Sequence, residues 1–130
     1  MDIKIGSKAT FKTTVDNSNT AKTMGSGSLD VFATPSMVAI MEKSSTMAIE
    51  PFLDDGSTTV GTALDITHVS ATPIGMEVFA TAEIIDINGR EITLKVQAFD
   101  TCGLIGEGTH KRFIVYAEKF QNKTNDKKSQ

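Results

Sequence analysis

Four strand-like stretches follow one another through the second half of the chain, with only short turns between them. They cover about 58–70, 75–87, 91–101 and 103–118, and each is rich in β-branched or aromatic residues. Parallel strands need crossover connections of about a dozen residues or more, and the turns here are far too short for that. The stretches therefore predict an antiparallel sheet arranged as a meander.

Asn88-Gly89 joins the second and third of these stretches. This dipeptide is a strong hairpin signal, because both central residues of a type I′ turn need a positive φ. We therefore expect a tight hairpin of this type between the two strands.

One long helix is predicted upstream of the sheet. Thr34-Pro35 offers an N-cap followed by proline at the first helical position, and many good helix formers continue through 36–52. Before it, the pattern of 9–15 predicts a strand, and the polar segment 16–30 predicts a loop. This order of elements predicts an α+β fold in which an antiparallel sheet wraps around one long helix.

The length is that of a single domain of ordinary size. A chain of 130 residues can bury one core but is too short for two independent ones. We expect this domain to cover residues 1–120. The last ten residues, 121–130, include no apolar side chain, so we expect them to form a polar, mobile tail.

Charge and hydropathy narrow the choice of partners and compartment. The formal net charge of -3 gives no overall positive field for binding nucleic acid. No apolar run approaches the roughly 18 residues of a membrane-spanning helix, so we expect no membrane association. The first residues lack the segments of a secretory signal, and Cys102 is the one cysteine, which together predict a cytoplasmic protein without disulfides.

Two histidines, His68 and His110, are the candidates for a general base that titrates near neutral pH. Strand alternation predicts that His68 shares a face with Val60, Leu64 and Ile66. From this position alone, a hydrogen-bonded packing role is favoured over a catalytic one. His110 lies among charged residues near a strand end, where exposure to solvent is the simplest interpretation.

Glu42 and Thr34 each have a structural and a chemical interpretation. Glu42 lies within the helix beside Ile40 and Met41. Burying an unpaired carboxylate is costly, so Glu42 either reaches water at the core boundary or is placed there for chemistry. Thr34 is expected to cap the helix, yet its hydroxyl also lies where free N–H groups and the helix dipole favour an oxyanion.

Several well-known site patterns do not occur in the sequence. None of the glycines forms a dinucleotide-binding or P-loop pattern in the required strand-turn-helix setting. No Cys/His group has metal-ligand spacing, and no Gly-x-Ser-x-Gly nucleophile elbow is present. We therefore expect neither a metal nor a separate cofactor.

Four sequence blocks occur together in a fixed order. They are 31–42 (VFATPSMVAIME), 60–75 (with VGT and THVSATPIG), 88–90 (NGR) and 105–112 (IGEGTHKR). Together they resemble the hot-dog thioesterases related to fluoroacetyl-CoA thioesterase, and the resemblance covers about residues 5–120.

The resemblance implies a hot-dog fold and hydrolysis of short acyl-CoA thioesters at a site between two protomers. It implies that Thr34, Glu42 and His68 form the catalytic set. It also implies that Gly61 and Arg112 bind substrate, Arg112 through coenzyme A phosphates, for which a guanidinium is well suited. Coenzyme A is then part of substrate and product, and the protein is a homodimer or a dimer of dimers.

The segment 22–29, just before the helix, contains no aromatic residue. The fluoroacetyl-specific member of the family has phenylalanines in this segment that close over the acyl group. We therefore expect a broader short-chain specificity here. Other functions remain open: a non-catalytic acyl-CoA binding or sensing module, a hot-dog enoyl-CoA hydratase or dehydratase, and a purely structural dimerisation domain.

Overall fold

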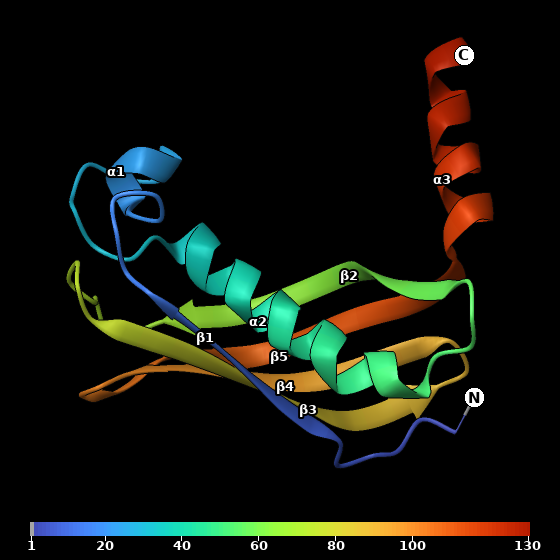
Figure 1. Ribbon diagram of the computed structural model, residues 1–130, viewed down its shortest axis with the longest axis horizontal. Helices are drawn as coiled ribbons and strands as arrows, with labels where there is room; N and C mark the ends of the chain where they lie inside the picture. Colours follow the sequence, from blue (N-terminus) through green and yellow to red (C-terminus); the bar gives the residue numbers. More distant parts are fainter. Residues whose placement is uncertain (1) are drawn as a thin grey trace.

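The long helix of the chain, α2, spans Thr34–Ile49 and lies across one face of a sheet (Figure 1). The computed structural model describes residues 2–130. The predicted helix is confirmed with two differences: α2 begins one residue earlier, at Thr34 rather than Pro35, and Glu50–Phe52 form a separate 3-10 turn, η1. Pro51 within η1 explains the change, because proline lacks the N–H that a further α-helical turn needs.

Ala33 is the N-cap of α2, so the predicted capping role of Thr34 is wrong. Ala33 has an extended backbone and makes no side-chain capping bond, and Thr34 is already the first helical residue. Pro35 fits the first turn at either position because the first N–H groups of a helix have no partner within it. The Thr34 hydroxyl is therefore available for another contact.

Five strands form one antiparallel sheet in the order β1-β3-β4-β5-β2. Their bounds are β1 Lys8–Thr14, β2 Ser57–His68, β3 Glu77–Asn88, β4 Glu91–Asp100 and β5 Gly103–Tyr116. The predicted strands are confirmed, and β3, β4 and β5 do form a meander. The prediction that β2 continues this meander is wrong, because β1 occupies the other side of β3 and β2 pairs with the free side of β5.

The turn between β3 and β4 lies one residue later than predicted. Asn88 pairs with Glu91, so the two central residues of the turn are Gly89 and Arg90. Gly89 has a φ of 62°, and among residues 2–130 no residue other than glycine has a positive φ. A glycine with positive φ at the first central position matches a type II′ turn, so the predicted type I′ turn is wrong although the hairpin itself is confirmed.

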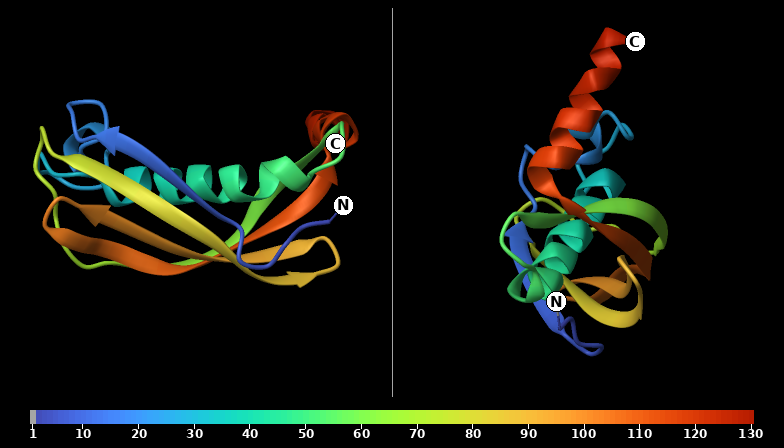
Figure 2. Two further views of the ribbon diagram at one scale, coloured as in Figure 1. Left: turned by 60° about the horizontal axis from the view of Figure 1, so that its bottom comes forward. Right: turned by 90° about the vertical axis from the view of Figure 1, so that its right-hand side faces the viewer.

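The core lies between α2 and the inner face of the sheet, which curves around the helix (Figure 2). α2 packs mainly against β1 and β3 and has little contact with β2. The largest fully buried side chains include Phe32, Met37, Met41, Ile49, Ile84, Ile92, Leu94 and Ile105. This arrangement confirms the α+β prediction of a sheet wrapped around one helix, and in β2, at one edge of the sheet, Thr59 is the single buried residue.

A β-bulge interrupts β2 at Thr62, where the register on β5 shifts between Gly61 and Ala63. A bulge places one extra residue in a strand, so the side chains on its two sides follow different alternations. Val60 comes before the bulge and His68 comes after it, so their side chains lie on opposite faces of the sheet. The prediction that they share a face is therefore wrong. Beyond it, Leu64 pairs with the buried His110 on the inner face but remains 38% exposed, because α2 does not cover this part of β2.

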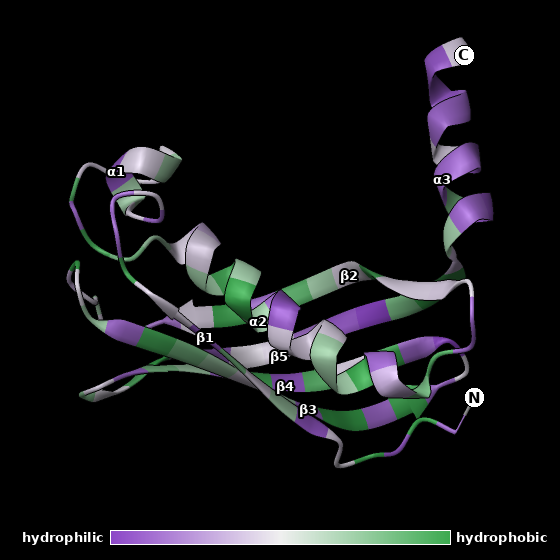
Figure 3. Cartoon of the chain, in the orientation of Figure 1, coloured by the Kyte–Doolittle hydropathy of each residue, from purple (hydrophilic) through white to green (hydrophobic). Residues whose placement is uncertain are grey.

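The two ends of the chain add short helices outside the sheet. α1 covers Ala21–Met24 in the long loop before α2, and α3 covers Ala117–Asn125, followed by the 3-10 turn η2 at Asp126–Ser129. α3 projects from the body, and its residues are mostly hydrophilic (Figure 3). The predicted tail of 121–130 thus continues a helix that starts inside the predicted domain, and its mobility stays a prediction. Within residues 2–130, no helix is long and apolar enough to cross a membrane.

Candidate active site

Thr34 and His68 meet at one end of the molecule, where α2 begins and β2 ends. The Thr34 Oγ1 and His68 Nδ1 atoms are 2.7 Å apart. The segment that leads into α2 is fixed by a backbone bond from the Phe32 N–H to the Thr72 carbonyl oxygen at 2.9 Å. Since each residue of the pair belongs to a hydrogen-bonded element, the contact between them has a defined geometry.

His68 has one ring nitrogen that lacks a partner. When the Thr34 hydroxyl donates to Nδ1, the proton of the neutral ring is on Nε2. Nε2 is buried, and within residues 2–130 it has no hydrogen-bond partner. Burial lowers the pKa of His68 from its ordinary value of 6.5, and the Ser70 backbone partly opposes the shift. A neutral imidazole in contact with a hydroxyl is the arrangement that a general base needs near neutral pH.

A surface pocket of about 290 Å³ opens beside this pair. Besides Thr34 and His68, it is lined by Ala21, Ser26, Val31, Phe32, Val69, Ser70 and Ala71. The lining combines a hydroxyl and an imidazole with small apolar groups, which is typical of a site that holds a small ligand and fixes its orientation.

Glu42 lies in the middle of α2 and forms an ion pair with Arg112 of β5. Glu42 Oε2 is 3.4 Å from Arg112 Nη1, and the side chains are 43% and 8% exposed, respectively. Arg112 also donates from Nε to the Thr59 Oγ1 at 2.8 Å and from Nη2 to the Thr59 carbonyl oxygen at 2.9 Å. Burial lowers the pKa of Arg112, and the negative charge of Glu42 opposes this shift. Because a buried cation needs partners, the pair fixes the position of the Glu42 carboxylate.

Arg112 is therefore not a solvated charge at a strand end. One N–H on Nε, two on Nη1 and one on Nη2 point at partners within the protein, which is four of the five N–H groups of a guanidinium. One N–H remains for any contact with a coenzyme A phosphate. The contact that the structure does show is the ion pair in which Arg112 holds the Glu42 carboxylate.

Gly61 of β2 faces the same ion pair. A Cβ atom at this position would lie 3.0 Å from Glu42 Oε2, 3.2 Å from His110 Cε1 and 3.4 Å from Arg112 Nη1. A pocket of about 260 Å³ lies here, lined in part by Gly61, Glu42 and His110. The missing side chain leaves room beside the carboxylate for another group.

His110 is 2% exposed, so the prediction that it faces solvent is wrong. Its Nδ1 is 2.8 Å from the Ala63 carbonyl oxygen, and its Nε2 is 3.2 Å from Arg112 Nη1. The adjacent Lys111 points outward, while His110 and Arg112 alternate with it on the inner face. The regular alternation with the apolar Ile114 is the sequence signal that locates both residues on this face.

The predicted site residues form two separate groups in one protomer. Thr34 and His68 are one group, and Glu42, Gly61 and Arg112 are the other. α2 is continuous from Thr34 to Glu42, and eight residues of helix span about 12 Å. A bend after Thr34, which could have brought the two groups together, is absent from this helix. One small acyl group therefore does not reach both groups within one chain.

Within residues 2–130, no group of three or more His, Cys, Asp or Glu side chains could hold a metal ion. The two groups of predicted site residues present a hydroxyl, an imidazole and a carboxylate.

Sequence comparisons connect this chain to one kind of enzyme. A family model described as fluoroacetyl-CoA-specific thioesterase matches residues 15–118. A fluoroacetyl-CoA thioesterase from Streptantibioticus cattleyicolor is 42% identical over 98 residues, which cover 75% of this chain and 70% of that protein. The resemblance predicted from the four sequence blocks is confirmed.

Solved structures give the same result. A fluoroacetyl-CoA thioesterase has a TM-score of 0.91 to this chain at 34% identity, with 98% of both chains covered. A thioesterase superfamily member from Thermus thermophilus has a TM-score of 0.90 at 29% identity, covering 98% of this chain and 94% of that one. The predicted hot-dog fold is thereby confirmed.

Proposed function

This chain belongs to the fluoroacetyl-CoA-specific thioesterase family and is a thioester hydrolase, and from this premise we propose that it hydrolyses short acyl-CoA thioesters at a site shared by two protomers. The observation that carries the chemistry is the 2.7 Å contact between Thr34 Oγ1 and His68 Nδ1. A hydroxyl in contact with a neutral imidazole is a nucleophile and base pair of the kind used in acyl transfer. No comparable observation favours a binding module or a hydratase.

In the proposed reaction, His68 takes a proton from the Thr34 hydroxyl or from a water molecule. The oxygen that loses the proton bonds to the thioester carbonyl carbon, the C–S bond breaks, and coenzyme A leaves as the thiolate, which the proton on His68 neutralises. Attack by Thr34 gives an acyl-enzyme that water hydrolyses in a second round, whereas attack by water gives the acid directly. The free N–H groups at the start of α2 favour the developing oxyanion.

Glu42 supplies the carboxylate of the proposed site. It either positions the attacking water or attacks the carbonyl carbon itself. In both cases its contribution to the reaction rate depends on a fixed position of the carboxylate. Arg112 provides this by holding the carboxylate from the inner face of β5. Gly61 contributes the empty space in which the thioester group lies beside Glu42.

The separation of the two groups supports a shared site. α2 holds Thr34 and Glu42 about 12 Å apart in one protomer, so a complete catalytic set needs one group from each of two copies. Most homo-oligomers are two-fold symmetric, and a two-fold axis creates two identical composite sites.

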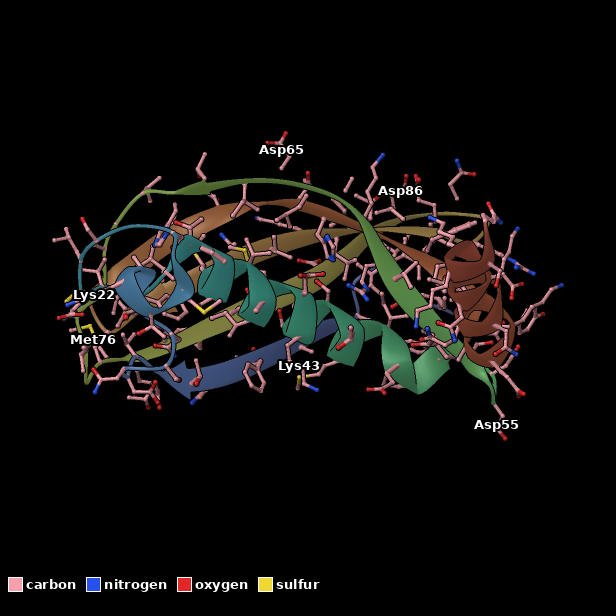
Figure 4. All side chains as sticks on the ribbon, turned by 90° about the horizontal axis from the view of Figure 1, so that it is seen from above. Lys22, Lys43, Asp55, Asp65, Met76 and Asp86 are labelled. Carbon is pink, nitrogen blue, oxygen red and sulfur yellow. The ribbon has the colours of Figure 1, made fainter. Side chains whose placement is uncertain are left out.

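The exposed edge of β2 is a suitable surface for this pairing. β2 is the last strand of the sheet, and residues 61–65 are all exposed. Asp65 points away from α2 in Figure 4, toward the open side of the strand. Antiparallel pairing of two β2 edges would remove unpaired backbone groups. A two-fold axis at Asp65 would place Thr62, the bulge residue next to Gly61, opposite the partner's His68, because Thr62 and His68 are equally far from that axis.

The loop before α2 bears on the choice of substrate. Residues 22–29 contain no aromatic side chain, and residues 22–30 are exposed. Without bulky rings near the pocket of Thr34 and His68, we propose that several short acyl groups are accepted rather than fluoroacetyl alone.

The first experiment is thiol release from a panel of short acyl-CoAs. The wild-type protein is compared with Thr34→Ala, Glu42→Ala and His68→Ala, and circular dichroism checks that each variant is folded. Turnover that is strongly reduced in all three folded variants is the expected result. Turnover that none of the three substitutions changes would contradict the proposed site, and loss of enoyl thioester absorbance without thiol release would favour a hydratase instead.

A further inference from the structure

We infer that His110 is a positioning residue of this site, which holds Arg112 against Glu42 and anchors the bulged part of β2 that carries Gly61. The inference rests on the proposed function, in which Glu42 and Gly61 contact the substrate. His110 itself touches no reacting atom in this proposal.

The hydrogen bonds of His110 determine where its proton lies. Nδ1 is 2.8 Å from the Ala63 carbonyl oxygen, which can only accept, so Nδ1 carries the proton. Nε2 then has a free lone pair, and it is 3.2 Å from Arg112 Nη1, which can only donate. His110 is thus a neutral ring whose two nitrogens are both used, one as a donor and one as an acceptor.

The bond from Arg112 to His110 restricts the guanidinium from one side. Nη1 of Arg112 donates both to His110 Nε2 and to Glu42 Oε2, and these two contacts are 3.2 Å and 3.4 Å long. Thr59 holds the Nε and Nη2 groups of the same side chain. With His110 as an acceptor, the guanidinium plane has a single orientation, and its second Nη1 hydrogen is directed at the Glu42 carboxylate.

The bond to Ala63 links His110 to the bulge. Ala63 is the first paired residue beyond the bulge at Thr62, and Gly61 is the last one before it. The imidazole ring therefore connects β5 to the irregular part of β2 through a side chain. The Cε1 atom of the same ring lies 3.2 Å from the point where a Cβ of Gly61 would be, so the ring also forms one wall of the space beside Glu42.

The surroundings of His110 keep it neutral. Glu42 of α2 and Arg112 of β5 are the charged groups that face it, its β2 neighbour contributes the Ala63 carbonyl, and its β4 partner is the apolar Leu94. Burial lowers the pKa of His110 most, and the positive charge of Arg112 lowers it further. The Ala63 bond and the negative charge of Glu42 act in the opposite direction. A protonated ring would lose its acceptor and repel Arg112, so the neutral form is the one that positions it.

Three substitutions separate the two bonds of His110. His110→Gln can retain an acceptor for Arg112, His110→Asn can retain a donor for Ala63, and His110→Phe keeps an aromatic ring with neither. We expect His110→Phe to lower kcat by about 10- to 100-fold with KM changed less than about threefold, as expected when a positioned group is displaced. His110→Gln should restore most of kcat. Thr109→Ala, on the outer face of the same strand, is the matched control.

A double-mutant cycle tests whether His110 acts through Glu42. In a Glu42→Gln background, His110→Phe should lower kcat by less than about threefold, because the carboxylate that it positions is already removed. The same fold loss in both backgrounds would overturn the proposal and leave His110 with a structural role. Full activity of Glu42→Gln alone would instead remove Glu42 from the proposed function, so the two failures are distinguishable.

The ring proton gives a readout that does not need turnover. Nitrogen-15 NMR of the imidazoles should show His110 protonated on Nδ1 near neutral pH, with a change in the Nε2 signal in folded Arg112→Met. His110→Gln, which removes the resonance, provides its assignment. Protonation on Nε2, or an Nε2 signal that is unchanged in Arg112→Met, would overturn the proposal.

Discussion

The two groups of the proposed site are built differently. Thr34 and His68 are joined by one hydrogen bond between the ends of two elements, and Thr34 is exposed. Glu42, Arg112 and His110 belong to the middle of a helix and a strand, where Arg112 and His110 are buried and tied to neighbouring backbone. Substitutions in the first group should therefore change the stability of the protein little. Substitutions in the second group should change both the activity and the stability of the sheet.

The largest expected effect is a loss of turnover after substitution in the group formed by Thr34 and His68. His68→Ala removes the proposed general base and should lower kcat by about 10²- to 10⁴-fold. Its unfolding midpoint should stay close to that of the wild type, because His68 is only partly buried. Thiol release and thermal unfolding are measured on the same samples, with Thr67→Ala on the opposite strand face as control. Activity within a few-fold of the wild type would show that the base lies elsewhere.

The buried group should lose both activity and stability. Arg112→Met removes the partner of Glu42 and two bonds to Thr59, so the free energy of unfolding should fall by about 1–3 kcal/mol. The remaining carboxylate is partly exposed and reaches water, which keeps the loss below that of a fully buried ion pair. Turnover should fall as Glu42 becomes mobile. The control is Lys111→Met, where loss of an exposed cation should cost less than about 0.5 kcal/mol.

Urea unfolding measures the free energy of unfolding of Arg112→Met and of Lys111→Met. Equal loss of stability in Arg112→Met and Lys111→Met would mean that the buried bonds of Arg112 contribute nothing beyond those of a surface charge. The contrast drawn between the two groups would then be incorrect.

The pH dependence of stability should differ between the two groups. Burial lowers the pKa of His68 and His110 from 6.5, so below about pH 6.5 the unfolded chain binds protons that the folded chain does not. Their contribution is complete above that pH and is lost as the pH falls below it. Between about pH 7 and pH 5.5, His110→Gln should flatten this dependence more than His68→Gln, because His110 is more deeply buried. Stability that rises as the pH falls through this window would contradict the assignment.

The smallest expected effect is the stability change in Thr34→Ala. Loss of an N-cap hydroxyl typically costs about 1 kcal/mol, but Thr34 is not a cap, so the free energy of unfolding should change by less than about 0.5 kcal/mol. Thr20→Ala is the matched comparison, since the Thr20 side chain does cap α1 by accepting from the Thr23 N–H. If Thr34→Ala is the more destabilised of the two, the Thr34 hydroxyl stabilises the fold more than a capping hydroxyl does, which would contradict this prediction.

The elements of the fold follow from local patterns in the sequence. Alternation and turn residues predict the five strands, and helix formers after Pro35 predict α2. The pairing of β2 with β5 does not follow from these local patterns. It depends on the pairing of β1 with β3, which is a contact between residues far apart in the chain. The turn at Gly89 and the N-cap at Ala33 differ by one residue from the prediction, since local signals do not fix the register of an element to a single residue.

The site was predictable in part. The family resemblance identified Thr34 and His68, and the structure places them in contact. His110 was misassigned because its charged neighbours indicated exposure, whereas strand alternation directs it inward with Arg112. The bulge at Thr62, which turns Gly61 toward Glu42, has no clear sequence signal.

Complementation between two inactive variants tests the shared site most directly. Glu42→Gln and His68→Ala are co-expressed with different tags, and the mixed dimer is purified and assayed for thiol release. If each site takes Glu42 from one protomer and the Thr34–His68 pair from its partner, one of the two sites in the mixed dimer is intact. We predict about half of the wild-type activity per dimer. A mixed dimer no more active than either parent homodimer would contradict the shared site.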